Sequence, residues 1–173
     1  MAEVSIRPML EPDLLGYKAL RDAILAGHPE AFTSDAETES LRDLASYRSR
    51  LAGGTNGGTL FTLVALDRGR VVGALTCERE PRRKVQHIAH LVGMMVADTH
   101  RGRGIGRALL AATIARLQAT DGLAQVTLSV TTSNRAAIGL YESVGFTRYG
   151  RLPDAIRLPD GRRLDKDLMA LRL

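Results

Sequence analysis

Cysteine, tryptophan and long apolar runs are what this sequence most clearly lacks. It has one cysteine, Cys77, and no tryptophan, and aromatic residues make up 4% of its 173 residues. A lone cysteine excludes an internal disulfide and is typical of a reducing cytoplasm. Scarce aromatic side chains argue against a stacking platform for nucleic-acid bases. No apolar run approaches the roughly 20 residues of a membrane span, and the N-terminus has no signal-peptide hydrophobic region. We therefore expect a cytoplasmic protein without a membrane or nucleic-acid partner.

Acidic residues are fewer than basic ones, 19 against 24, which gives a net charge of +5 and a pI near 9.9. The basic residues are spread out, and their clearest cluster, Arg82–Lys84, lies at an expected turn. The excess of basic residues fits either a generally basic surface or the binding of a polyanionic small ligand. Four histidines and one cysteine show no metal-ligand spacing, so no metal is expected. The length and the 45% apolar content predict one domain over residues 1–173.

The most informative stretch joins an apolar strand to a helix through a short loop of glycines and arginines. Residues 90–96 are almost entirely apolar, and residues 105–117 have helical periodicity. Free backbone N–H groups and the positive end of the helix dipole coincide in such a loop, so it is typical of a phosphate site. Glycine lets phosphate oxygens approach the backbone and tolerates positive φ angles.

Two common phosphate-binding patterns fail here. The dinucleotide fingerprint needs a third glycine where the chain has Arg107 or Leu109, and no Lys-Ser or Lys-Thr pair follows the glycines. What remains is Arg101-x-x-Gly104-x-Gly106, an [R/Q]-x-x-G-x-G pattern. This pattern resembles the pyrophosphate loop of the GNAT superfamily of acetyl-CoA-dependent N-acyltransferases. Glycine- and arginine-containing loops also occur as plain turns, so the rest of the chain must decide.

The rest of the chain predicts an α+β fold with a mixed sheet. Strand 126–131 alternates between apolar and polar residues, and it follows strand 85–96 and the helix 104–119. Strand, helix and strand in this order form a right-handed βαβ unit with two parallel strands. The other expected strands pair antiparallel, and helices cover both faces of the sheet. The further strands are expected at 4–7, 60–66, 71–77, 146–151 and 163–171, the further helices at 11–27, 34–51 and 133–144, and a surface loop at 53–58.

A second motif follows that crossover. Residues 134–146 fit the pattern N-x-x-A-x-x-L-Y-x-x-x-G-F, which resembles the second GNAT motif and begins 33 residues after Arg101. Two independent motifs in the right order are far more specific than either one alone. The resemblance is strong over residues 89–146 and rests only on the order of elements at both ends. The wider pattern looks like small bacterial members of no assigned substrate.

The resemblance implies where acetyl-CoA binds. In the family the two parallel strands splay apart, and the pantetheine arm pairs with backbone at the end of the first strand, here Met95 and Val96. Asn134 would lie beside this arm or at the helix start, and Arg135 would reach the ribose phosphate. The pyrophosphate would accept hydrogen bonds from backbone N–H groups of Arg101, Gly102, Arg103, Gly104, Ile105, Gly106 and Arg107.

The resemblance also implies an acetyl transfer by direct attack of a primary amine on the thioester. Tyr141 would protonate the leaving thiolate, and backbone N–H groups near Met95 or Val96 would hold the oxyanion. Some relatives carry a glutamate base eleven residues before the loop; that offset gives His90, whose imidazole suits proton transfer near neutral pH. His87 and Glu78 are neighbouring alternatives. Without the family motif, Tyr141 and His90 would be interpreted as core residues.

The acceptor stays open at this point. In this fold it is selected by the first helix pair and the late strands, so its expected lining is His28–Phe32, Tyr47 and Tyr149–Ile156. A small-molecule amine and a peptide N-terminus both fit. The alternative is a non-catalytic acyl-CoA-binding regulatory module, against which the intact Tyr141 argues. Relatives often dimerise, so a homodimer is also left open.

Overall fold

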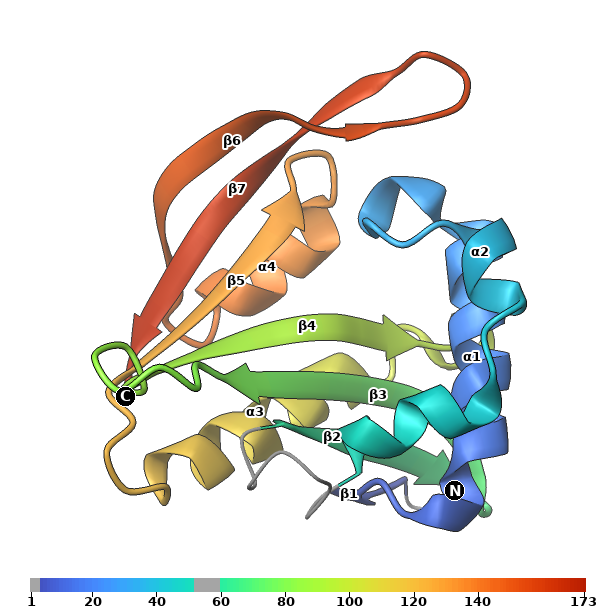
Figure 1. Cartoon of the computed structure of the whole chain (residues 1–173), viewed down its shortest axis with the longest axis horizontal. Coiled ribbons are helices and arrows are strands. Elements are labelled where there is room, and N and C mark those ends of the chain that lie inside the picture. Colours follow the sequence, from blue (N-terminus) through green and yellow to red (C-terminus); the bar gives the residue numbers. More distant parts are fainter. Residues whose placement is uncertain (1–3, 52–59) are drawn as a thin grey trace.

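The computed structural model describes residues 4–51 and 60–173, and its centre is one seven-stranded sheet (Figure 1). The strand order is β1-β2-β3-β4-β5-β7-β6. The strands are β1 (Ser5–Pro8), β2 (Leu60–Asp67), β3 (Arg70–Arg79), β4 (Ile88–Val96), β5 (Gln125–Thr131), β6 (Thr147–Arg157) and β7 (Arg163–Arg172). The loop expected at 53–58 lies outside the described residues.

One strand pair is parallel, β4 with β5, and the other pairs are antiparallel. The helix α3 (Ile105–Gln118) forms the crossover between these two strands. The expected mixed sheet with a single parallel βαβ unit is therefore confirmed. In the described chain, the pairing of β4 with β5 extends from Ile88 to His90 and then ends, and Figure 1 shows the two strands diverging from there.

Helices cover both faces of the sheet, as expected. The larger core lies between the sheet, α3 and α4 (Arg135–Glu142), and includes Leu109, Leu110 and Tyr141. A smaller core on the other face packs α1 (Leu14–Gly27) against Val64 and Met95. Among the helices of the described residues, none has the length and apolar character needed to cross a membrane.

The structure corrects the helix expected over residues 34–51. It consists of α2 (Ala36–Ser40) and a separate 3-10 helix, Leu44–Arg50. The reason is a second start signal: the Asp43 carboxylate accepts a hydrogen bond from the Ala45 N–H (3.2 Å), just as Asp35 caps α2 at Thr38 (2.8 Å).

Two strand boundaries differ from expectation by at least three residues. β4 begins at Ile88 rather than Val85, because the chain makes consecutive turns in which Val85 N–H donates to Arg82 and Ile88 N–H donates to Val85 (both 2.9 Å). β6 extends to Arg157 rather than ending at Arg151. It does so through irregular pairing with β7 between Leu152 and Ile156, a feature that simple alternation does not reveal.

Candidate active site

A bulge in β4 shapes the site. Opposite Leu75, β4 carries one extra residue, because Ala74 pairs with Met95 whereas Thr76 pairs with Val92. Gly93 lies in this bulge with φ +61°, a left-handed conformation that favours glycine. Past the bulge, β4 no longer pairs with β5. The β5-facing backbone groups of Met94 to Val96 are therefore placed like those of a sheet edge, which can accept an extended ligand as an additional strand.

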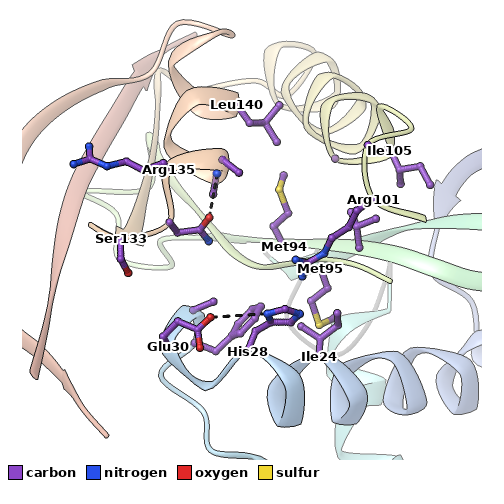
Figure 2. A pocket seen from close by; sticks show the side chains of 18 of the residues that line it. Ile24, His28, Glu30, Met94, Met95, Arg101, Ile105, Ser133, Arg135 and Leu140 are labelled. Carbon is purple, nitrogen blue, oxygen red and sulfur yellow. Dashed lines mark hydrogen bonds and ion pairs between the residues drawn. The ribbon is translucent and has the colours of Figure 1, made fainter. Parts of the chain in front are cut away.

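A cavity of about 840 Å³ lies along this edge (Figure 2). Met94 lies between Leu140 of α4 and Met95, while His28 and Ile24 come from α1 and its end on the opposite side. Nine of the residues predicted to bind the cofactor line it: Met95, Val96, Arg101, Gly102, Gly104, Ile105, Gly106, Asn134 and Arg135. The structure therefore gathers both sequence motifs around one space.

The glycine loop closes one end of the cavity at the start of α3. Gly102 and Gly104 have φ angles of +74° and +76°, and nothing lies within 4 Å of the position where a Cβ would be. Gly104 is the N-cap of α3, whose first turn contains no acidic residue. The first N–H groups of a helix have no acceptor within it, so they and the helix dipole favour an anion here. The side chains of Arg103 and Arg107 are exposed and do not line the cavity.

Tyr141 lies next to this space. It lines a second cavity of about 190 Å³ that shares Met94, Asn134 and Ala137 with the first. The side chain is 8% exposed, and its burial raises the pKa of the phenol to about 12. The hydroxyl donates to the Met94 sulfur at 3.7 Å, which is a weak acceptor. The phenol is therefore protonated at neutral pH and lies beside a sulfur atom.

His90, the residue predicted as the base, contacts Thr127 and Glu80. Its Nδ1 lies 2.5 Å from the Thr127 hydroxyl and its Nε2 lies 3.1 Å from a Glu80 carboxylate oxygen. It lies where β4 still pairs with β5, four residues before Met94, which is roughly 13 Å along a strand. It lines neither cavity. The eleven-residue offset from Arg101 identified His90 as a residue of the strand before the loop. Which side chains lie near His90, however, depends on where β4 and β5 separate.

Some residues of the predicted acceptor lining lie at the larger cavity. His28, Glu30, Ala31 and Phe32 line the larger cavity, and His28 Nε2 lies 3.0 Å from Asp98 at the start of the glycine loop. Tyr47 is fully buried, however, and residues 149–156 line neither of the two cavities.

Sequence reasoning missed two lining residues, Lys166 and Arg162. Both come from the β6–β7 hairpin, which reaches the site from the end of the chain. No local pattern marks these residues, because β7 comes beside β5 only through sheet pairing. Among the described residues, no group of acidic, histidine and cysteine side chains is arranged to hold a metal ion.

Comparison with known proteins agrees with this geometry. The model of the acetyltransferase (GNAT) family matches residues 18–146. An N-alpha-acetyltransferase 30 of Schizosaccharomyces pombe is 32% identical over 92 residues, which is 53% of this chain and 61% of that protein. For two further curated relatives the match covers 46% and 43% of their length, so the chain spans about half of the relatives it matches.

Solved structures match nearly the whole chain. A ribosomal-protein-alanine N-acetyltransferase from Brucella melitensis is 29% identical, with a TM-score of 0.83 over 98% of this chain and 99% of that one. A Salmonella typhimurium protein, solved with its cofactor acetyl-CoA, has a TM-score of 0.81 at 24% identity and covers 99% of this chain and 95% of that one. At this identity, the second likeness shows the fold alone. From its match to the family model, supported by its fold, the chain belongs to the acetyltransferase (GNAT) family.

Proposed function

We propose that this protein transfers the acetyl group of acetyl-CoA to a primary amine, with both substrates bound at once. The observation that carries the proposal is the arrangement of one cavity along the open edge of β4, with the glycine loop at one end and Tyr141 beside it. Family membership supports acetyl transfer, and the names of the yeast and Brucella relatives describe transfer to an amine. The Salmonella neighbour binds acetyl-CoA.

In this proposal each part of the site has one task. The backbone N–H groups from Arg101 to Arg107 bind the pyrophosphate, since the loop is open and the helix end is positive. The backbone of Met95 and Val96 pairs with the amide-containing pantetheine arm. Asn134 already caps α4 through the Ala137 N–H (3.2 Å), and it lines the cavity with Arg135.

The chemistry needs little beyond positioning. The neutral amine attacks the thioester carbonyl, N–H groups near Met95 or Val96 stabilise the oxyanion, and the C–S bond then breaks. The Tyr141 hydroxyl leaves its weak hydrogen bond with the Met94 sulfur and gives its proton to the departing thiolate. The attacking nitrogen loses its proton to water. The residues that line the Tyr141 cavity in the described chain include no carboxylate or imidazole, whereas His28 and Glu30 line the adjoining larger cavity.

The lack of such a base in the Tyr141 cavity favours one alternative, a regulatory module that binds acyl-CoA without turnover. Two measurements decide between these functions. The first titrates acetyl-CoA into the protein by calorimetry, and the second follows free thiol release with a panel of amines. Binding followed by amine-dependent thiol release supports the enzyme. Binding without turnover on any amine supports the module, and no binding contradicts both.

A further inference from the structure

Lys166 is a cavity-lining amine that the proposed chemistry does not use. The chain has three lysines, Lys18, Lys84 and Lys166. Lys84 is exposed, and Lys18 pairs with Asp22 at 2.6 Å. Lys166 differs from both, because it is half-buried and lines the smaller cavity together with Tyr141. It is thus the lysine that adjoins the space in which the proposed leaving group departs.

The strand register directs the Lys166 side chain toward the gap between β4 and β5. On β7, Lys166 pairs with Thr131 of β5. Its ammonium nevertheless reaches back along β5 to Ser129, whose hydroxyl lies 3.5 Å from Nζ. Ser129 lines the smaller cavity, and it is two residues beyond Thr127, which belongs to the last residue pair that joins β5 to β4 in the described chain. The amine therefore lies just past the point where the two strands part.

The opposite wall of this gap is β4, just before the backbone that pairs with the pantetheine arm in the proposed function. Val92, Gly93 and Met94 line the smaller cavity from β4, and Met94 also lines the larger one. The Tyr141 hydroxyl donates to the Met94 sulfur at 3.7 Å, so the proposed acid lies at the same wall. An amine and the acid for the leaving group around one cavity are the arrangement that acetyl transfer needs.

The surroundings of Lys166 favour the neutral, nucleophilic amine. Burial lowers the pKa of Lys166, because the ammonium form loses contact with water in this position. Among the described residues no carboxylate lines the smaller cavity, so no counter-ion there restores the charged form. The Ser129 hydroxyl is a neutral partner. Lysines that react as nucleophiles or bases in enzymes are activated by such a loss of solvation.

We propose that Lys166 is a self-acetylation site, whose Nζ attacks acetyl-CoA bound to the same chain. The N–C bond forms and the thioester C–S bond breaks, while Tyr141 gives its proton to the departing thiolate. The attacking nitrogen loses its extra proton to water, and water returns a proton to the Tyr141 oxygen. The products are acetylated Lys166 and free coenzyme A. This inference rests on the proposed function and adds a second acceptor, a side chain of the protein itself.

The test incubates the protein with acetyl-CoA and no added amine. Peptide mass spectrometry measures acetylation at each of the three lysines over time. We expect Lys166 to be acetylated at least about tenfold faster than the exposed Lys84, with a matching release of thiol, because its position beside the thioester replaces a bimolecular encounter. The first-order rate constant should not depend on the protein concentration, since the amine and the thioester belong to one chain.

Three variants locate the reaction. Lys166→Arg keeps the positive charge and should abolish the adduct, while calorimetry should show an unchanged affinity for acetyl-CoA. Lys84→Arg is the matched control, in which acetylation of Lys166 should persist. Tyr141→Phe should slow acetylation of Lys166 about a hundredfold and leave the slow reaction of Lys84 unchanged, because only Lys166 reacts beside the phenol.

The outcomes separate this proposal from the proposed function. Acetylation that is no faster at Lys166 than at Lys84, or equally fast in Tyr141→Phe, contradicts self-acetylation, and so does a rate constant that rises with protein concentration. Thiol release with an added amine but no adduct at Lys166 supports the enzyme and overturns only self-acetylation. A Tyr141-dependent adduct at Lys166 without turnover on any added amine supports the self-acetylation site and contradicts transfer to a free amine.

Discussion

At the scale of single residues, Tyr141 is the side chain whose chemistry the fold changes most. It packs edge-on against Phe146, with ring centres 5.8 Å apart, and burial holds its pKa near 12. A phenol with this pKa stays protonated across the working pH range, which suits an acid and not a base. Deprotonation of this acid at high pH should lower kcat. The fall of kcat at basic pH should therefore begin above about pH 10.

Tyr141→Phe should lower kcat by about a hundredfold, within the usual range for loss of a general acid, with acetyl-CoA affinity nearly unchanged. Phenylalanine keeps the contact with Phe146 and removes only the hydroxyl, so the fold should persist. Steady-state kinetics and calorimetry measure the two effects. His90→Ala is the matched control, because His90 lines neither cavity and kcat should stay close to the wild-type value. A collapse of affinity in Tyr141→Phe would make the residue a packing group.

Part of the candidate site could be predicted from the sequence. Asn134 and five of the seven loop residues line one cavity, because short motifs fix their own backbone geometry. His90 lines neither cavity and Lys166 was missed, because the surroundings of both residues depend on which strands lie beside each other. The binding and catalytic roles assigned to all of these residues stay predictions.

At the scale of elements, the start of α3 depends on the left-handed conformation of Gly104. In Gly104→Ala a Cβ would strain this conformation at a cost of about 1 kcal/mol and shift the N–H groups that face the cavity. We expect the KM for acetyl-CoA to rise about tenfold in steady-state assays. Gly69→Ala imposes the same kind of strain in the β2–β3 turn at φ +77°, where nothing lies within 4 Å, and should lose similar stability without a change in KM.

The contact of α1 with α2 depends on an ionised Glu39. Its pKa is about 2 in the folded protein and near 4.5 when exposed, so the folded state favours the charged form. The stabilisation is fully present above about pH 4.5 and is lost as the pH falls toward 2. Urea midpoints measured between pH 6 and pH 3 should therefore fall less in Glu39→Gln than in the wild type. Glu37→Gln, an exposed neighbour on α2, should follow the wild type.

At the scale of the whole molecule, all described strands belong to one sheet, with a core on each face. We infer that residues 1–173 form one domain and expect a single cooperative unfolding transition by calorimetry. Acetyl-CoA at 100 times its Kd should add about 2.7 kcal/mol, which raises Tm by about 5–10 °C for a protein of this size. Two transitions, only one of which shifts with acetyl-CoA, would contradict the single domain. A cytoplasmic location and a homodimer stay predictions.

The sequence by itself determined the order of elements, the parallel crossover and the family, because these follow from local periodicity and from two motifs that shape their own backbone. Tertiary structure alone decided where β4 and β5 part and which side chains surround the resulting cavities. Met94, Tyr141 and Lys166 are far apart in the sequence and carry no shared pattern. They line one cavity because α4 packs on the sheet while β7 pairs beside β5, and long-range packing of this kind leaves no local signal.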